Sequence, residues 1–380
     1  MFPTEQGWDR IVNGTGSYTP TAHFTSVRGP HTLAEALAVT DWTESASSDG
    51  RKITSKLSLT VADPRADLAD GPDAPLGWMG QQIIARAGFR HRDRELVVPL
   101  GQWLIDEPGT EPSRWTAYGP PDEPMWVERG TDAQPAATDL LSLLEDDLPW
   151  LTGPRTNATV WSEIVRLVEG RIPIADTWAG LAPTARVPAG VVYDGDRLTA
   201  ICDLLATIGA VAWVNRAGAL EPRPAEPAGI DWVIPADAIV APLMRGGRDG
   251  LFNRAIVTGT TEGNEEIRAV ASETSGPFSV DGPFGVVTKT FNNPLAKTQR
   301  SLDATALTYL RQGIEGRMVR WQVDLAVPNF ALDVLDRVQL VLPDGQTVTG
   351  PVVALTRSQT GMQIEIPARY AEVWPDAVTL

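Results

Sequence analysis

The stretch Asp196–Pro224, DRLTAICDLLATIGAVAWVNRAGALEPRP, shows most clearly how this chain is built. Asp196 is placed to cap a helix, and Gly209 is placed to end it. Helical spacing puts four apolar residues on one face of that helix: Leu198, Ile201, Leu205 and Ile208. Two short strands follow around Asn215–Gly218, a turn that Asn and Gly favour. Nothing in the stretch is a catalytic motif, so it predicts a packing unit.

Arg216 lies in the middle of this turn. We expect it to contribute neither burial nor a special backbone conformation. The four apolar helix residues, in contrast, are expected to be core, because such a face can be buried only against the hairpin and a neighbouring unit.

On the N-terminal side, residues 1 to about 130 have the pattern of short β-strands. In KITSKLSLTVADP (52–64), four apolar residues alternate with polar ones: Ile53, Leu57, Leu59 and Val61. Residues 81–89 and 95–108 also have strand length and are bounded by turn residues. Short, regularly spaced strands with Gly and Pro between them are typical of a small barrel or sandwich.

Helical spacing begins near residue 137 and continues to the opening stretch. Residues 137–150 place Leu140, Leu141, Leu144 and Leu148 on one face, with Thr138 or Asp139 as the N-cap. Residues 157–170 repeat the pattern with Val160, Ile164, Leu167 and Val168, and Gly170 is the expected stop.

Beyond residue 230 the pattern returns to β, with one further helix over 301–314 and a hairpin signal at Asp344-Gly345. The sequence therefore predicts an α+β, mainly β chain. Its expected parts are a β region over 1–130, an α+β middle domain over 131–230, and a second β region over 231–380 with a helix-containing insertion around 260–315.

Composition excludes several classes of protein. The 380 residues carry a formal net charge of −16, which disfavours non-specific binding to nucleic acid or to an anionic membrane surface. The N-terminus has no secretory signal pattern, so we expect synthesis in the cytoplasm. No segment is apolar over the length of a membrane-spanning helix. The single cysteine, Cys202, excludes an internal disulfide and is expected to be a small buried residue.

No candidate for catalysis, cofactor or metal binding is convincing. The glycine-rich GTGSYT (14–19) lacks the third glycine and the helix of a dinucleotide fingerprint. His23, His31 and His91 lack an i, i+4 pair and are expected in exposed loops. The acidic groups are explained without catalysis. A solvated helix end accounts for Glu145, Asp146 and Asp147. A Pro/Gly loop, whose spacing fits calcium poorly, carries Asp63, Asp67, Asp70 and Asp73, and a turn with an N-cap accounts for Asp194 and Asp196.

The order of these segments resembles the tail hub proteins of long-tailed bacteriophages, specifically minor tail proteins of phages that infect actinobacteria. The residues that carry the resemblance are KITSKLSLTVADP (52–64), LGWMGQQIIARAGF (76–89), VPLGQWLIDEP (98–108), the opening stretch, FNRAIVTG (252–259) and VPNFALDVLDRVQLVLPDG (327–345), in which Asp336 precedes a strand. They are signatures of packing and turns, and their order over most of the chain makes the similarity.

The resemblance implies two tail-tube-like β-barrel domains, 1–130 and 231–380, with the middle domain as a brace. It also implies a homotrimer that forms the hub of the tail tip, with no enzymatic activity, metal or cofactor. A distal tail protein or tail tube protein would bind above the hub, and tip, fibre or spike proteins would bind below it. A tape measure protein is a further possible partner, and genomic DNA would pass through transiently without specific binding. Two alternatives stay open. The 13 tryptophans would permit a carbohydrate-binding tail protein, and a tail-associated cell-wall hydrolase is the other.

Overall fold

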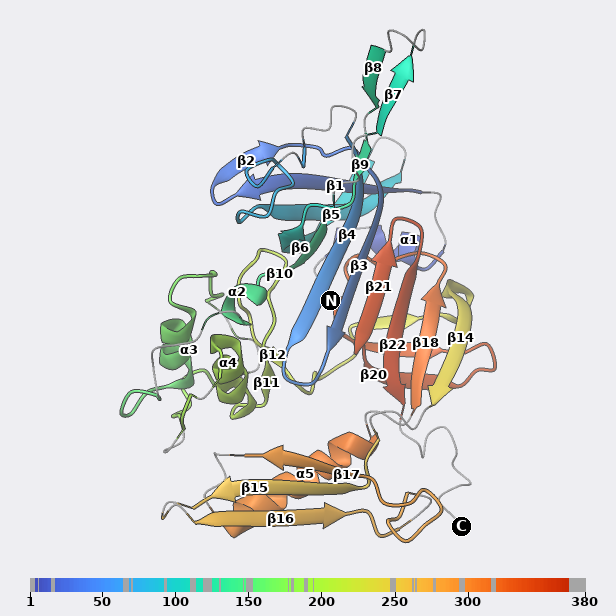
Figure 1. Cartoon of the computed structure of the whole chain (residues 1–380). Helices are drawn as coiled ribbons and strands as arrows, with labels where there is room; N and C mark the ends of the chain where they lie inside the picture. Colours follow the sequence, from blue (N-terminus) through green and yellow to red (C-terminus); the bar gives the residue numbers. More distant parts are fainter. Residues whose placement is uncertain are drawn as a thin grey trace.

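The computed structural model places most of the chain in one large sheet, a helical middle unit and a lower layer of three strands and a helix (Figure 1). The structure describes residues 4–5, 7–14, 18–63, 68–69, 71–91, 94–109, 114–118, 125–129, 131–145, 147, 153–176, 178, 181–187, 191–193, 195–246, 251–261, 263, 265–275, 278–293, 298–315 and 319–368.

The large sheet has twelve strands drawn from both ends of the chain. The N-terminal part supplies β1 (Thr19–Arg28), β2 (His31–Ala34), β3 (Val39–Ser48), β4 (Ile53–Asp63), β5 (Gln82–His91), β6 (Arg94–Glu107), β9 (Thr131–Ala133) and β10 (Ala136–Asp139). The C-terminal part supplies β14 (Ile239–Gly246), β18 (Val319–Leu325), β21 (Ala354–Ser358) and β22 (Met362–Ala368). The two parts meet where β3 and β21 pair antiparallel, from Thr43 opposite Ser358 to Ser47 opposite Ala354.

This sheet is open where two closed barrels were expected. The hydrogen-bonded order is β14-β18-β22-β21-β3-β4-β10-β6-β5-β1-β2, with β9 beside β4. No closed barrel is found among the described strands, although their mainly β character is as expected. The domain boundaries near residues 130 and 230 stay a prediction.

Alternation along the strands builds the main core. In β4 the four expected residues, Ile53, Leu57, Leu59 and Val61, are all buried, and the polar residues between them are at least partly exposed. Rings from distant segments meet on the same side of the sheet. Phe89 contacts Trp8 of α1 (Trp8–Val12) at 5.1 Å and Phe330 at 5.3 Å between centroids. Such tilted contacts are favourable for aromatic pairs.

The middle unit contains α2 (Ser142–Glu145), α3 (Val160–Val168), α4 (Arg197–Ala206), β11 (Ala210–Val211) and β12 (Arg223–Pro224). The helical segment expected over 137–150, with Thr138 or Asp139 as its N-cap, begins later than expected: 136–139 form β10 between β4 and β6, and α2 begins at Ser142. Backbone pairing with two strands outweighs helix formation at 136–139. The expected faces of α3 and α4 are buried, except that Ile208, beyond the end of α4, is only half-buried.

The ends of α4 and its hairpin match the expectation. The side chain of Asp196 accepts a hydrogen bond from the backbone N–H of Thr199 at 2.7 Å. Gly209 has φ +69°, a left-handed backbone that glycine adopts without strain. The hairpin closes around Asn215, whose backbone N–H donates to the carbonyl of Ala219 at 2.8 Å.

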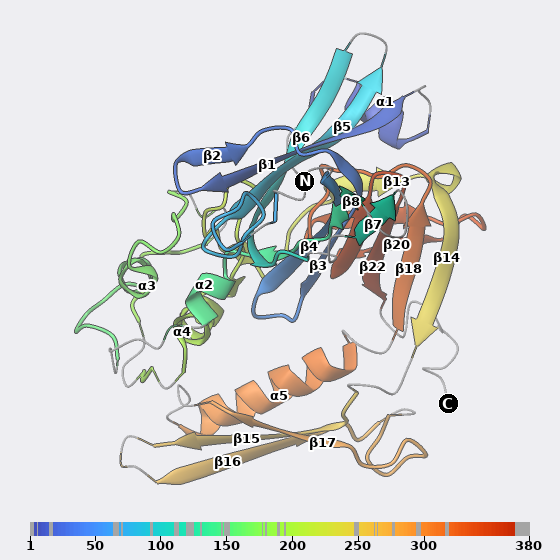
Figure 2. The ribbon, with the colours of Figure 1, turned by 45° about the horizontal axis from the view of Figure 1, so that its top comes forward.

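The lower layer lies below the sheet in Figures 1 and 2 and includes the helix expected over 301–314. It consists of β15 (Arg254–Thr260), β16 (Glu266–Ser272), β17 (Thr288–Asn292) and α5 (Gln299–Glu315). Leu302 and Ala306 of α5 are buried with Val257 and Ala269 of the small sheet. The remaining elements are β7 (Arg114–Tyr118), β8 (Met125–Arg129), β13 (Trp232–Ile234), η1 (Ala236–Ala238), β19 (Arg337–Val341) and β20 (Thr347–Pro351). The turn between β19 and β20 contains Gly345 at φ +86°, as Asp344-Gly345 predicts.

Candidate functional site

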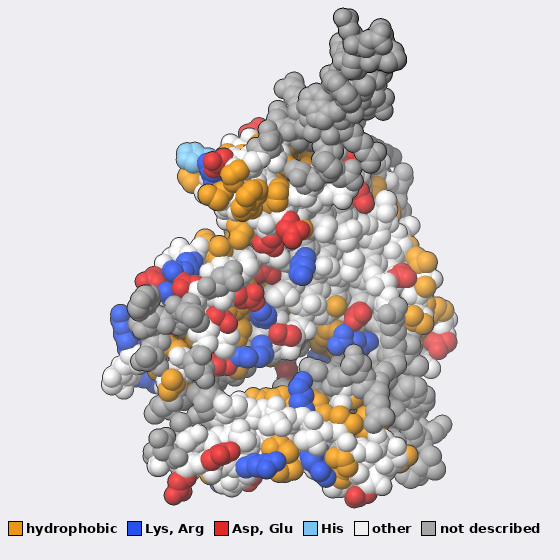
Figure 3. Space-filling model, in the orientation of Figure 1, with side chains coloured by type: hydrophobic (Ala, Val, Ile, Leu, Met, Phe, Trp, Pro, Cys, Tyr) orange, Lys and Arg blue, Asp and Glu red, His pale blue; other side chains and the backbone are white. Residues whose placement is uncertain are grey.

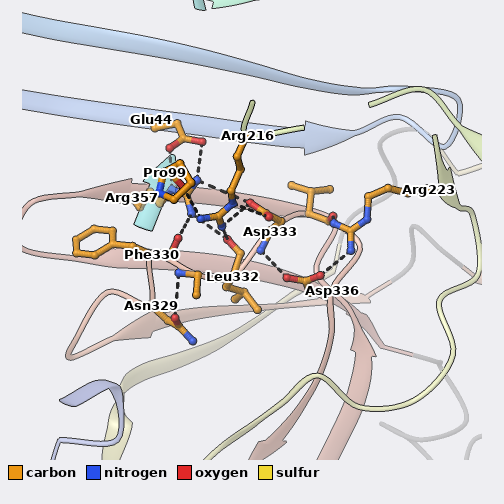
Figure 4. A network of polar contacts seen from close by, with 12 residues as sticks. Glu44, Pro99, Arg216, Arg223, Asn329, Phe330, Leu332, Asp333, Asp336 and Arg357 are labelled. Carbon is orange, nitrogen blue, oxygen red and sulfur yellow. Dashed lines mark hydrogen bonds and ion pairs between the residues drawn. The ribbon is translucent and has the colours of Figure 1, made fainter. Parts of the chain in front are cut away.

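Six charged side chains meet inside the protein where the large sheet, the middle hairpin and the C-terminal segment join (Figure 4). We call this group the arginine junction; it consists of Glu44, Arg216, Arg223, Asp333, Asp336 and Arg357. Glu44 comes from β3, Arg357 from β21, and the two aspartates from the segment between β18 and β19. The other two arginines come from the helix–hairpin unit.

Arg357 ties the two halves of the large sheet together. Its Nε and Nη2 donate to the two carboxylate oxygens of Glu44 at 2.7 and 2.9 Å. Its Nη1 donates to the carbonyls of Phe330 and Leu332 at 3.2 and 2.9 Å. The paired, fork-like geometry is the strong form of an arginine–carboxylate contact. Both side chains are almost fully buried, so neither charge has solvent as an alternative partner.

Arg216 is buried, and the expectation of an inert turn residue is wrong. Its side chain is 4% exposed, and Nε and Nη2 each donate to a carboxylate oxygen of Asp333 at 2.9 Å. Nη1 donates to the carbonyl of Pro99 in β6 at 2.6 Å. The turn itself sits close to β6: a side chain at Gly218, where φ is +79°, would meet Gln102. Arg216 therefore anchors the hairpin to two separate parts of the fold.

Arg223 makes the third link. Its Nη2 donates to Asp336 at 2.6 Å, and its Nη1 donates to the carbonyl of Val334 at 2.6 Å. The second carboxylate oxygen of Asp336 accepts from the backbone N–H of Asp333 at 2.7 Å, which fixes the loop that carries both aspartates. The guanidinium also lies 4.9 Å from the ring centre of Trp213, within cation–π range.

The electrostatics favour the ionised form of the junction. Burial by itself would raise the pKa of Asp333, but Arg216, Arg357 and Arg223 together hold that pKa below its usual value. Burial by itself would lower the pKa of Arg357, but Glu44, Asp333 and Asp336 raise it. Each charge is thus compensated by opposite charges and hydrogen bonds, as a buried ionic group requires.

A cavity of about 30 Å³ lies beside the junction, with Glu44, Ser55, Gln102, Asp139 and Arg216 among its lining residues. It has room for a water molecule and not for an organic substrate. Asp139 accepts hydrogen bonds from the backbone N–H groups of Ser55 at 2.5 Å and Leu141 at 2.9 Å. Burial raises the pKa of Asp139 to about 6. These contacts hold β10 and the start of α2 against β4.

A shallower hollow of about 280 Å³ lies over β3, β18, β21 and β22. Its lining includes Thr43, Asp324, Thr356, Met362 and Gln363. Gln363 donates to Asp324 at 2.6 Å, so the carboxylate is already engaged. The lining residues combine no nucleophile with a base, and the hollow has no arrangement that suggests a reaction.

The acidic groups considered from the sequence do not converge. Glu145 contacts Lys52, as expected of an exposed helix end, whereas Asp147 contacts Arg171 and pairs with Arg197 at 2.7 Å. Asp73 pairs with Arg28 at 2.6 Å. Asp67, Asp70, Asp146, Asp194 and the side chain of Asp63 lie outside the described residues. Part of GTGSYT, residues 15–17, also lies outside them.

The histidines lie in strands and not in the expected loops. His23 in β1 contacts Glu95 at 2.9 Å, His31 begins β2, and His91 ends β5. Within the described ranges, no three His, Cys, Asp or Glu side chains are grouped to hold a metal ion. Cys202 is buried as expected, and burial raises the pKa of its thiol to about 12.

The tryptophans are mainly structural. Among the nine whose side chains the structure describes, Trp78 is the only exposed one; the others are Trp8, Trp42, Trp103, Trp161, Trp178, Trp213, Trp232 and Trp321. A sugar-binding groove would need several exposed rings together. Among the residues that the structure describes, no helix is long and apolar enough to cross a membrane.

Sequence reasoning missed Glu44, Asp333 and Arg357 as partners. One signal was available for two of them, because strand alternation places Glu44 on the face of Trp42 and Arg357 on the face of Leu355. A charged residue on the buried face of a strand predicts an ionic partner inside the protein. The identity of that partner has no local signal.

The whole arrangement is similar to solved structures of phage tail proteins. The tail protein from Neisseria meningitidis MC58 matches with a TM-score of 0.57 and 10% identity, over 94% of this chain and 99% of that one. The 43 kDa tail protein of prophage MuSo2 from Shewanella oneidensis matches with a TM-score of 0.55 and 11% identity, over 93% of this chain and 98% of that one. No protein-family model matches the sequence, and no curated protein matches it. The chain thus has the fold of these tail proteins.

Proposed function

We propose that this chain is a structural protein of a phage virion, the hub that joins the six-fold tail tube to a three-fold tail tip. The observation that carries the proposal is the fold match to two tail proteins over nearly the full length of all three chains. Fold alone does not define function. A structural role also agrees with the interior of the protein, where the buried charged side chains of the arginine junction bind separate segments of the chain to each other.

In this proposal three copies form a ring. Each copy supplies two β lobes, from the N-terminal and C-terminal parts of the chain, so that three copies present six lobes to a six-fold tube. The pairing of β3 with β21 supports this role, because it makes the two lobes parts of one sheet. Force on one lobe is then carried to the other through backbone hydrogen bonds and the pair of Arg357 with Glu44.

The helix–hairpin unit acts as the brace. Ala212 exchanges backbone hydrogen bonds with the start of β4, donating to Arg51 at 3.0 Å and accepting from Ile53 at 2.8 Å. Arg216 and Arg223 then reach the C-terminal segment on the other side of the hairpin. The unit is therefore tied to both parts of the chain, with its apolar helix face buried within the middle unit.

The proposed neighbours are a distal tail protein or tail tube protein above the ring and tip, fibre or spike proteins below it, with a tape measure protein at the passage. DNA passes through the ring without specific binding. The protein is not an enzyme and needs no metal or cofactor in this role. The protein is synthesised in the host cytoplasm, and it resides in the tail tip of the virion.

Imaging of purified tails tests the proposal. We expect density for three copies of the chain in one ring at the tail tip. A ring of six copies, a single copy, or absence from the tail would overturn it. Cell-wall cleavage in a zymogram, or specific binding in a glycan array, would support the hydrolase or the carbohydrate-binding alternative instead.

A further inference from the structure

The lower layer, residues 251–315, is inserted between two neighbouring strands of the large sheet. β14 ends at Gly246 and β18 begins at Val319, and these two residues lie opposite each other in the antiparallel pair. The chain therefore leaves the large sheet and returns to it at the same place. The pairing of β14 with β18 needs no residue of the layer. We call the rest of the described chain the body.

The layer has an apolar core of its own. The buried residues of its two clusters all belong to the layer: Phe252, Ala255, Val257, Ala269, Leu302, Ala306 and Leu310. Among the described residues, the clusters of the large sheet and of the middle unit contain none from the layer. The close packing of α5, β15, β16 and β17 is with one another. A separate core is the mark of a separate folding unit, and a unit of roughly 60 residues is marginally stable on its own.

A buried amide of the layer also finds its partners inside the layer. Asn253 is 1% exposed, and its Nδ2 donates to the carbonyls of Phe278 and Gly285 at 2.9 and 2.7 Å. Its Oδ1 accepts from the backbone N–H of Val287 at 2.8 Å. These bonds hold the loop before β17 against the start of β15. The layer is therefore organised by its own polar contacts as well as by its own core.

The side of the layer that lies toward the body is exposed. β17 is an end strand of the small sheet and lies on the side of the body (Figure 1). Its residues Thr288, Lys289, Thr290 and Asn292 are exposed. Figure 3 shows the surface hollowed between the layer and the body above it. A layer that shared an interior with the body would bury this edge.

Tyr309 of α5 brings the layer to charged groups of the body. Its ring packs on Phe291 of β17, with 4.5 Å between the ring centres. On the body, Arg51 in the turn between β3 and β4 pairs with Asp203 of α4 at 2.5 Å. Burial raises the pKa of Tyr309, and Arg51 and Asp203 act on that pKa in opposite directions, so the phenol lies within the field of the pair. The two charged side chains are 51% and 41% exposed, and such a pair is weak and screened by salt.

We infer that the lower layer is a separately folding unit that docks reversibly on the body, with Tyr309 seated beside Arg51 and Asp203. It leaves this seat as a unit while the large sheet stays intact. The physical reason is the contrast between the two kinds of contact. Apolar burial and hydrogen bonds hold the layer together, whereas an exposed polar contact holds it to the body. The inference concerns the single chain, so it does not depend on the ring of the proposed function.

Hydrogen exchange of the full-length protein tests the separate folding. Val257 of β15 and Val323 of β18 are both fully buried, so Val257→Ala and Val323→Ala are matched substitutions in the two parts. Val257→Ala should accelerate exchange of the backbone amides of β15 and β16 by about tenfold or more and leave β3 and β21 unchanged. Val323→Ala should do the reverse. Equal acceleration in both parts by either substitution would show one cooperative unit and overturn the inference.

Distances between spin labels test the docking. Ala206 of α4 and Ala304 of α5 are exposed, so cysteines at these positions carry one label on the body and one on the layer. Cys202 is buried, so labelling is directed to the two introduced thiols. Arg51→Glu replaces the ion pair of the seat with two like charges. We expect it to lengthen and broaden the distribution of distances between the two labels.

Two controls make this measurement decisive. Lys56→Glu makes the same change of charge at an exposed position on β4 and should leave the 206–304 distances unchanged. A label pair within the layer, at Ala304 and at Val270 of β16, should give the same distances in all three proteins. An unchanged 206–304 distribution in Arg51→Glu, or an equal change in Lys56→Glu, would overturn the proposed seat. A change in the pair within the layer would overturn its movement as a unit.

Discussion

Arg357 and Glu44 lie 313 residues apart in the sequence and form a two-point ion pair inside the protein. The pair bridges β21 and β3, the strands at which the two ends of the chain join one sheet. The pair therefore links the N-terminal and C-terminal parts of the protein directly.

Removing one partner of this pair should be strongly destabilising. Glu44→Ala leaves the Arg357 guanidinium buried and incompletely compensated, for which we expect a loss of about 3–5 kcal/mol in the free energy of unfolding. Glu44→Leu with Arg357→Met removes both charges and should recover most of that loss. Urea unfolding of the three proteins measures this. A double variant no more stable than the single one would contradict the explanation.

Arg216→Ala should also destabilise, contrary to the expectation from its place in a turn. The substitution removes the main partner of Asp333 and the contact with Pro99, with an expected loss of roughly 2–5 kcal/mol. Arg268→Ala, at an exposed position on β16, is the control and should change stability by less than about 0.5 kcal/mol. Thermal melts of both variants check the difference. Equal melting temperatures would support the expectation that Arg216 is an inert turn residue.

Two changes in the helix–hairpin unit should impair folding and tail incorporation together. Leu205 is fully buried, so Leu205→Ala should cost about 2–5 kcal/mol. Gly209→Val places a β-branched side chain at φ +69°; space is available there, and the cost comes from backbone strain. Melting temperature and incorporation into tails are measured side by side. Normal stability with failed incorporation would indicate a binding surface and not a brace.

Asp139 should make stability fall as the pH rises. Its pKa is about 6 in the folded protein and 3.8 for the unperturbed group, so the folded state binds the extra proton between these values. The stability that this proton contributes is present below pH 3.8 and is lost as the pH rises through 6. From pH 5 to pH 8 the wild type should lose about 1 kcal/mol relative to Asp139→Asn. Asp333, whose pKa is lowered, stays ionised over that range. A difference between the two proteins that does not change with pH would refute this.

Folding should not depend on a metal ion. Chelator added during a thermal melt is expected to leave the transition cooperative and its midpoint unchanged. A lower midpoint, restored by calcium, would direct attention to the acidic loop of residues 63–73.

Local features were predictable from the sequence because their causes are local. The cap at Asp196, the stop at Gly209, the turn at Gly345 and the alternation along β4 depend on backbone sterics and on residues a few positions apart. The buried faces of α3, α4 and α5 followed from spacing in the same way. The absence of known catalytic motifs also needed no structure. The type and order of most elements could therefore be predicted.

Tertiary structure determined which strands pair and which charged residues become partners. Residues 137–139, the expected start of a helical segment, pair as part of β10 between β4 and β6, because two neighbouring strands offer more hydrogen bonds than an isolated helical turn. Arg216 looked like a surface residue because its partner, Asp333, lies 117 positions away. The two expected barrels share an open sheet because β3 meets β21, a pairing between distant segments. Propensity and spacing act within about one turn or one strand. Ion pairs and sheet edges act between whatever segments the completed fold brings together, and only the folded chain determines those partners.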